Sequence, residues 1–254
     1  MESLKTYRKF LTTDYWTTQR EGGYKTDQEK KLPLPAAQKG YSRDSVLIDL
    51  VELDQFGVGT IPLIDAIRMR RSRRKYSQQS LTLEELSFLL WATQGIQKRR
   101  KIYAGARGTL RTVPSGGARH PFETYLVINN VDTLKSGLYR YLPIENKLLY
   151  LRSGKSLSKK VAASCNNQNW IGKAALIFIW TAIPYRTEWR YSFIAAKTIA
   201  QESGHICQNL YLASEAIGAG TCAVGAYHQK ELDNILGVDG EDELVVYIAP
   251  VGKI

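Results

Sequence analysis

The 254-residue sequence predicts an α+β fold, because helical and strand patterns alternate along it without a repeating strand–helix–strand unit. Hydrophobic residues make up 44% of the chain and charged residues 23%, which is ordinary globular composition and excludes a chain that is disordered throughout. There are neither internal repeats nor low-complexity tracts. The length allows one domain with extra chain at an end, so a single core should serve most of the sequence.

Residues 1–59 differ from the rest and are expected to form an N-terminal extension. They are rich in Lys, Thr, Gln and Tyr and include a loose stretch from Lys25 to Arg43. Regular organisation begins at residue 60, so we expect the main domain to span residues 60–254. No apolar run approaches the ~20 residues that a membrane span needs, and the first residues lack a secretory signal. We therefore expect a cytoplasmic protein with no membrane partner.

Two helices open the predicted domain. The first begins around Thr60 and Pro62, because proline is favoured in the first turn of a helix. The second begins after Thr82, which forms a capping box with Glu85, and ends near Gly95. The apolar positions are Leu63, Ile64 and Ile67 in the first helix and Leu86, Leu89 and Leu90 in the second.

Strand patterns dominate the middle and the end of the chain. A loop over residues 105–117 is expected to lead into a strand at 123–128, and residues 138–141 and 148–151 should form a β-hairpin. Residues 174–183 and 244–249 are apolar runs of strand character. Between them, residues 193–217 have helical periodicity.

The net charge of +11, from 35 basic and 24 acidic residues, is compatible with nucleic acid, an anionic membrane or anionic ligands as partners. Basic runs at residues 68–75 and 98–101 lack the interleaved aromatic residues of a base-stacking surface, so we do not expect nucleic-acid binding. Cys165, Cys207 and Cys222 show no metal-ligand spacing, so no metal site is predicted. Buried free thiols in a reducing compartment fit them best.

Arg70, Arg71, Ser72, Arg73 and Arg74 follow the first helix directly. Guanidinium groups match the oxygens of a phosphate, and the serine hydroxyl adds a compact donor, so this cluster suits a nucleotide or flavin phosphate. The alternative is a solvated basic helix end that interacts favourably with the helix dipole.

Pro114, Ser115, Gly116 and Gly117 form a second notable cluster. Backbone without Cβ atoms can approach a flat aromatic cofactor closely and direct amides toward it. An ordinary turn before a strand is the alternative interpretation.

Together these clusters, in this order, resemble the nitroreductase family, and within it the SagB-type (ThcOx-like) dehydrogenases. The resemblance covers about residue 55 to the C-terminus. It is carried by residues 70–74, 89–96, 111–117, 137–141, 204–210 and 218–225.

The resemblance implies a nitroreductase-like fold, with a central, mostly antiparallel sheet flanked by helices, and a homodimer with FMN at the interface. The phosphate of FMN would be bound by Arg70, Arg71, Ser72 and Arg74. The flavin ring would lie against residues 114–117 and near Val224, Gly225 and Ala226. Lys253 matches a basic position that commonly reaches the phosphate end.

Arg190 and Tyr191 occupy the place of a Lys-Tyr pair that precedes Gly-His in relatives that oxidise azolines in peptides. Arginine, unlike lysine, effectively cannot lose its proton, so this departure weakens the case for azoline oxidation. Tyr191 is a candidate for proton transfer, and Arg190 for stabilising negative charge on reduced flavin. The alternative is that both only form the wall of a pocket.

Gly204 and His205 lie within the long helical pattern. Glycine costs up to about 1 kcal/mol in a helix, so we expect Gly204 to allow close approach of another backbone or of a partner subunit. We expect His205 to be a hydrogen-bonded core residue rather than a base.

The resemblance favours a dehydrogenase that oxidises a small molecule or a peptide (azoline-like) by hydride transfer to flavin. The first alternative is a reductase that takes hydride from NAD(P)H and passes it to a nitro compound, quinone or flavin. A non-catalytic basic protein that binds flavin or nucleic acid is the alternative from another class.

Overall fold

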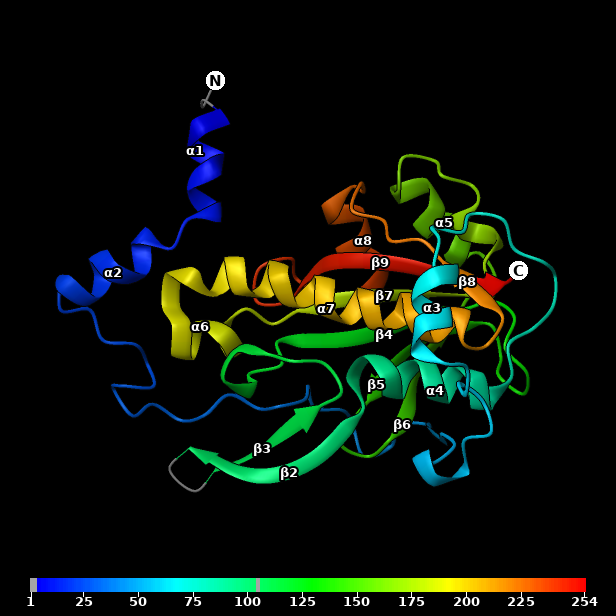
Figure 1. Cartoon of the computed structure of the whole chain (residues 1–254), viewed down its shortest axis with the longest axis horizontal. Helices are drawn as coiled ribbons and strands as arrows, with labels where there is room; N and C mark the ends of the chain where they lie inside the picture. Colours follow the sequence, from blue (N-terminus) through cyan, green and yellow to red (C-terminus); the bar gives the residue numbers. More distant parts are fainter. Residues whose placement is uncertain (1–3, 104–105) are drawn as a thin grey trace.

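The structure, a computed structural model, describes residues 4–103 and 106–254. Its centre is a seven-stranded sheet in the order β1-β6-β5-β4-β7-β9-β8, and every strand pair in it is antiparallel (Figure 1). The strands are β1 (Leu47–Asp49), β4 (Phe122–Ile128), β5 (Gly137–Leu142), β6 (Lys147–Ser153), β7 (Leu176–Ala182), β8 (Ala219–Thr221) and β9 (Leu244–Lys253). The predicted α+β class, with an antiparallel sheet between helices, is confirmed.

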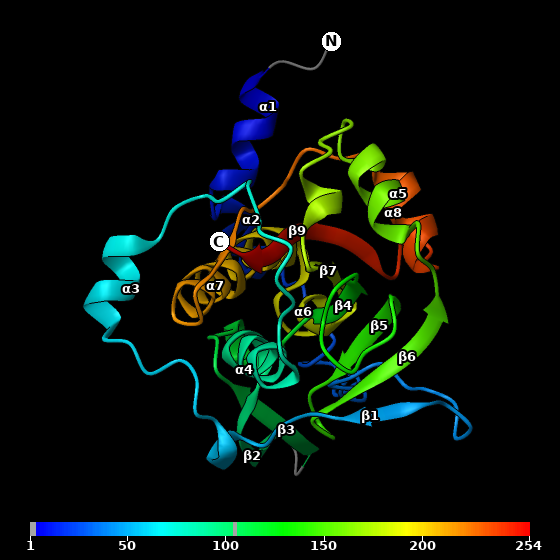
Figure 2. The ribbon, with the colours of Figure 1, turned by 90° about the vertical axis from the view of Figure 1, so that its right-hand side faces the viewer.

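Helices cover both faces of this sheet. Figure 2 shows α4 (Leu83–Gln94) and α7 (Ala195–Glu215) on one side, and α5 (Leu157–Ser164) and α8 (Gln229–Leu236) on the other. Four further helices lie outside these layers: α1 (Leu4–Arg8), α2 (Asp14–Glu21), α3 (Leu63–Met69) and α6 (Tyr185–Tyr191). Short 3₁₀ turns occupy Lys9–Leu11, Leu53–Gln55, Gly116–Ala118, Ile171–Lys173 and Ser192–Ile194.

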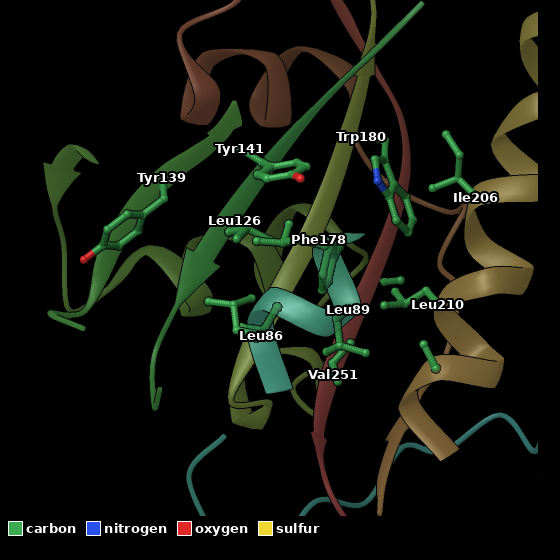
Figure 3. Packing of buried hydrophobic residues seen from close by; sticks show 14 of the residues in the cluster. Leu86, Leu89, Leu126, Tyr139, Tyr141, Phe178, Trp180, Ile206, Leu210 and Val251 are labelled. Carbon is green, nitrogen blue, oxygen red and sulfur yellow. The ribbon is translucent and has the colours of Figure 1, made fainter. Parts of the chain in front are cut away.

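The larger hydrophobic core lies between the sheet and the pair α4 and α7 (Figure 3). Along β7, Phe178 and Trp180 point into this core, whereas Ile177 and Ile179 point into the second core beneath α5 and α8. Successive side chains of a strand face opposite sides of the sheet. Both sides are covered here, so β7 is apolar throughout rather than alternating.

The predicted capping box of α4 is present in full. The Thr82 hydroxyl oxygen accepts the Glu85 N–H at 3.1 Å, and the Glu85 carboxylate accepts the Thr82 N–H at 2.9 Å. Gly95 ends the helix. The predicted hairpin is also confirmed as β5 and β6, and the long helical pattern as α7.

The loop predicted for residues 105–117 is wrong over its first part. Strand β3 (Ala106–Arg111) pairs there with β2 (Ile96–Tyr103) as a separate two-stranded ribbon. Gly105 itself lies outside the described residues. The strand β2 contains Gln-Lys-Arg-Arg-Lys and has no apolar alternation, because the hairpin projects from the body (Figure 1). The periodicity that signals a half-buried strand is therefore missing.

The later part of residues 1–59 is integrated into the sheet domain. Strand β1 pairs with the edge strand β6. Just before it, the Glu123 carboxylate accepts the Lys39 N–H at 2.8 Å, and the Arg140 guanidinium donates to the Gly40 carbonyl at 2.7 Å. The Arg111 guanidinium donates to the Ala37 carbonyl at 2.9 Å. Buried side chains of the sheet domain thus hold the extended backbone around residue 39.

Within residues 4–103 and 106–254, none of the helices is long and apolar enough to cross a membrane. The same residues include no group of three or more His, Cys, Asp or Glu side chains arranged to hold a metal ion.

The capping box of α4 provides a stability test. Thr82→Ala removes the acceptor for the Glu85 N–H and should lower the free energy of unfolding by about 1 kcal/mol. Urea unfolding monitored by circular dichroism measures the change. Ser156→Ala is the matched control, because Ser156 precedes α5 without making a side-chain capping bond. Equal effects of the two substitutions would contradict the assignment.

Candidate functional site

The arginine motif runs from the end of α3 along β8. Arg70 is the C-terminal cap of α3, and Ser72 then forms a parallel bridge with Thr221 of β8. The Arg73 N–H donates to the Thr221 carbonyl at 2.9 Å. These bonds fix the backbone of the motif against the edge of the sheet.

The four arginines of the motif have different environments. Arg73 pairs with the buried Glu215 of α7 at 3.4 Å, and the same carboxylate accepts the Arg71 N–H at 3.2 Å. In the described part of the chain, no carboxylate lies within ion-pair distance of Arg70, Arg71 or Arg74. Arg70 and Arg74 lie over aromatic rings instead, 5.5 and 5.8 Å from the ring centres of Tyr211 and Trp170. The Arg71 guanidinium donates to the carbonyls of Arg68 and Arg70 at 3.0 and 2.8 Å. The charges of these three arginines are therefore not neutralised by a carboxylate of the described chain.

Tyr211 of α7 connects the arginine motif to the segment that contains Val224, Gly225 and Ala226. Its hydroxyl lies 3.2 Å from the Ser72 hydroxyl and accepts the Ala223 N–H at 2.9 Å. Val224 is buried and bonded to β9, whereas Gly225 and Ala226 are exposed. Tyr211 therefore brings the arginine motif close to the predicted segment 224–226.

Lys253 lies beside the motif but directs its charge inward. Its carbonyl accepts the Ser77 N–H at 2.8 Å. Its ammonium group is buried, pairs with Glu85 of the capping box, and donates to the Ile217 carbonyl at 2.6 Å. In this arrangement Lys253 joins the start of α4 to the end of β9.

The glycine loop, residues 114–117, is held by the first half of α7. The Glu202 carboxylate accepts the Gly116 N–H at 2.6 Å, and the Ser115 hydroxyl oxygen accepts the His120 N–H at 2.8 Å. Pro114 is exposed. Glu202 is only 3% exposed, and burial raises its pKa, while its bonds to Gly116 and Ser115 act in the opposite direction. The loop conformation therefore depends on a buried carboxylate.

Arg190 and Tyr191, at the end of α6, contact this loop directly. A Cβ atom at Gly117 would lie 2.7 Å from Cδ of Arg190 and 3.0 Å from the Tyr191 hydroxyl oxygen. Gly117 also has φ of +56°, a left-handed conformation that glycine adopts without strain. The structure thus places the predicted catalytic pair against the predicted flavin-binding loop.

The arginine motif and the glycine loop lie at different places on α7. Glu202 contacts the loop, whereas Tyr211 and Glu215 contact the motif. A helix rises about 1.5 Å and turns about 100° per residue. Along the helix axis, Tyr211 is therefore about 14 Å and Glu215 about 20 Å from Glu202. These contacts also lie on roughly opposite faces of the helix. One chain therefore does not bring the loop and the motif to a common cavity.

Glu202, Tyr211 and Glu215 are site residues that the sequence interpretation did not identify. The available signal was two acidic residues in a helix with many buried positions, where a buried charge needs a partner. Their partners lie in loops far away in the sequence, so the pattern alone did not reveal them.

The expectation for His205 is wrong, because its side chain is exposed. The charged and polar face of α7 points outward at that position. At Gly204, a Cβ atom would meet no atom of the described chain within 4 Å. Close approach of another segment of the same protomer therefore does not explain this glycine.

Comparison with known proteins identifies the family. The model of the nitroreductase family matches residues 67–253. A nitroreductase homologue from Methanocaldococcus jannaschii is 31% identical over 205 residues, which cover 81% of this chain and 98% of that protein. The chain therefore belongs to the nitroreductase family.

Two more distant relatives are named for peptide processing. The trifolitoxin-processing protein TfxB of Rhizobium leguminosarum is 25% identical over 63% of this chain, and the microcin B17-processing protein McbC of Escherichia coli is 23% identical over 51%. The matches span only 44% and 49% of those proteins.

Solved structures share the fold. A nitroreductase homologue from Ralstonia eutropha superposes with a TM-score of 0.65 at 26% identity, covering 87% of this chain and 98% of that one. A homologue from Desulfovibrio desulfuricans, solved in complex with FMN, has a TM-score of 0.50 at 19% identity, covering 76% and 86%.

His120, which follows the glycine loop, should make stability depend on pH. It is 4% exposed, and burial, together with the nearby charge of Arg111, lowers its pKa to about 3. Between pH 6.5 and 3 the unfolded chain binds a proton at this histidine and the folded chain does not, so stability falls as pH falls. From pH 7 to 5 this amounts to roughly 2 kcal/mol.

Replacement of His120 by Gln should remove this contribution, so the variant should lose less stability than the parent protein between pH 7 and 5. Urea unfolding at both pH values measures the difference. The exposed His205→Gln is the control and should keep the slope of the parent. A slope that is the same in all three proteins would refute the prediction.

Proposed function

We propose that the chain is an FMN-dependent oxidoreductase of the SagB-type dehydrogenase subgroup. The observation that carries this proposal is that the guanidinium groups of Arg70, Arg71 and Arg74 lack a carboxylate partner among the described residues. Ser72, in the same motif, adds a hydroxyl that lies 3.2 Å from the Tyr211 hydroxyl. Rigid guanidinium donors fit the oxygens of a phosphate monoester. The donor set therefore fits the phosphate end of FMN.

The glycine loop and the pair Arg190 and Tyr191 provide the other half of the proposed site. FMN, when bound, supplies the acceptance and release of a hydride. Arg190 would place positive charge beside the ring, and Tyr191 would hold or transfer a proton at its hydroxyl. Gly225 and Ala226, exposed near Tyr211, would border the same ligand.

A homodimer would bring these halves together. The motif and the loop of one chain lie on opposite faces of α7, so a shared site would take the motif from one protomer and the loop from its partner. Leu63, Ile64 and Ile67 of α3 are 57–65% exposed, which supports an apolar contact between protomers. The open surface at Gly204 supports close approach of a partner helix.

For the reaction, we favour oxidation of a small molecule or a peptide over reduction by NAD(P)H. The names of the two peptide-processing relatives support this choice. An NAD(P)H-dependent nitro, quinone or flavin reductase is the second candidate. The three buried free cysteines support a cytosolic setting.

The colour of the purified protein distinguishes a flavin enzyme from a non-catalytic basic protein. A yellow protein that releases FMN on denaturation supports the proposal. A colourless protein with salt-dependent affinity for nucleic acid supports the alternative.

The arginine motif can be tested by flavin content. Arg70→Ala combined with Arg74→Ala should release FMN, because two of the three available guanidinium groups are lost, while circular dichroism remains unchanged. Absorbance after denaturation gives FMN per chain. The control is Arg68→Ala, which removes an exposed arginine paired with Asp65 on α3.

Equal flavin content in the double variant and the parent would disprove the phosphate role. Light scattering on the same samples gives the mass in solution. A monomeric mass with flavin still bound would contradict the shared site.

The roles of Arg190 and Tyr191 can be distinguished by substitution. Tyr191→Phe keeps the ring and removes only the hydroxyl, so flavin should stay bound while kcat falls by roughly 100-fold or more. Arg190→Lys should retain much of the activity and Arg190→Ala should lose it, because positive charge rather than proton exchange is needed.

Steady-state kinetics with NADH, NADPH and azoline peptides, followed by flavin absorbance, provides the assay for these variants. If Tyr191→Phe and Arg190→Ala both retain full activity, the pair only forms the wall of the pocket.

A further inference from the structure

Helix α2 and the chain that follows it lie beside α6, whereas α1 points away from the body (Figure 1). The Gln28 N–H donates to the Trp189 carbonyl at 2.8 Å, and the Trp189 indole N–H donates to the Leu32 carbonyl at 3.2 Å. The Tyr185 hydroxyl donates to Asp27 at 3.0 Å. The extension is therefore fixed beside the pair that ends α6.

A cavity of about 280 Å³ lies between the extension and this pair. It is lined by Trp16, Arg20, Thr26, Gln28, Glu29, Arg190 and Tyr191. The rings of Trp16 and Tyr191 are 6.1 Å apart, and the Arg20 guanidinium lies 4.6 Å from the centre of the Trp16 ring. Two aromatic rings and two guanidinium groups therefore line this space, and two of these side chains, Arg190 and Tyr191, also contact Gly117 of the glycine loop.

The charges around this cavity favour an anion. Among the described residues, neither Arg20 nor Arg190 forms an ion pair with a carboxylate. Glu29 is the single acidic group of the lining, and it already accepts the N–H and the hydroxyl of Thr26 at 2.8 and 3.0 Å. The cavity thus keeps a net positive charge.

The size and the aromatic walls restrict the ligand further. Small-molecule sites commonly have volumes of about 300–1,000 Å³, so this cavity suits a compound of one or two rings. Flat rings pack well against Trp and Tyr, and a guanidinium group binds a carboxylate through paired hydrogen bonds.

We propose that the extension forms the outer wall of the substrate pocket and selects a planar ring that carries a carboxylate. Arg20 binds the carboxylate, and Trp16 packs on the ring. The ring would lie beside Arg190, Tyr191 and Gly117. That it is a substrate there rests on the proposed function. Residues 16–29 would then determine specificity and are more than a structural tail.

Calorimetric titration with 4-nitrobenzoate and its neutral analogue 4-nitrobenzamide tests this selectivity on the full chain. The parent should bind the benzoate at least about 10-fold more tightly. Arg20→Gln should reduce the preference to less than about 3-fold, and Arg20→Lys should retain most of it. Trp16→Ala should weaken both ligands in similar proportion.

Arg43→Gln is the matched control, because it removes the same charge from an exposed position of the extension outside the cavity. It should bind both compounds like the parent. Equal affinities of the parent for the two compounds, or an unchanged preference in Arg20→Gln, would overturn the proposal.

FMN content of the same preparations tests the proposed function separately from the carboxylate pocket. A colourless protein that still prefers the benzoate would refute the flavin assignment and support the pocket. A yellow protein without the preference would support the flavin assignment and refute the pocket.

Discussion

Burial of two carboxylates on α7 is the constraint on which both halves of the candidate site depend. Glu202 and Glu215 are only 3% and 7% exposed, so neither carboxylate is hydrated by bulk water. A buried charge is tolerated only when it is paired or hydrogen-bonded. Glu202 therefore fixes the glycine loop, and Glu215 fixes the backbone and one arginine of the arginine motif. The helix that closes the core also positions the chemistry.

A second set of buried charges integrates the extension. Glu123 pairs with Arg186 at 2.6 Å and lies 4.0 Å from Arg140. Glu123, Arg140 and Arg111 all bond the backbone of residues 37–40. Removing one partner of such a network leaves a charge without compensation, which is more damaging than losing a surface ion pair. The same strands therefore support both the core and the path of the extension toward the site.

Much of the fold could be predicted from local patterns. The capping box of α4, the hairpin of β5 and β6 and the apolar strand β7 all have signals within about ten residues. Strands β2 and β3 lack such a signal, because residues 97–101 of β2 are exposed and the buried residues of β3 include the polar Thr109 and Arg111. His205 was placed wrongly because the helical pattern shows which residues share a face but not which residue at its margin remains exposed.

For the site, the sequence indicated the arginine motif, the glycine loop and the pair at 190–191 as separate clusters. Their arrangement could not be predicted, because it depends on tertiary contacts made by Glu202, Tyr211 and Glu215. The contact between Gly117 and Arg190 joins residues more than seventy positions apart. A pattern confined to one segment carries no information about such a contact.

The two outermost strands of the sheet limit how copies of this chain can associate. Strands β1 and β8 are each three residues long, so the edges of the sheet offer few unpaired backbone groups to another strand. Short edge strands are a common protection against edge-to-edge aggregation. A sheet continued across two protomers is therefore disfavoured, and stable association falls to helical surfaces.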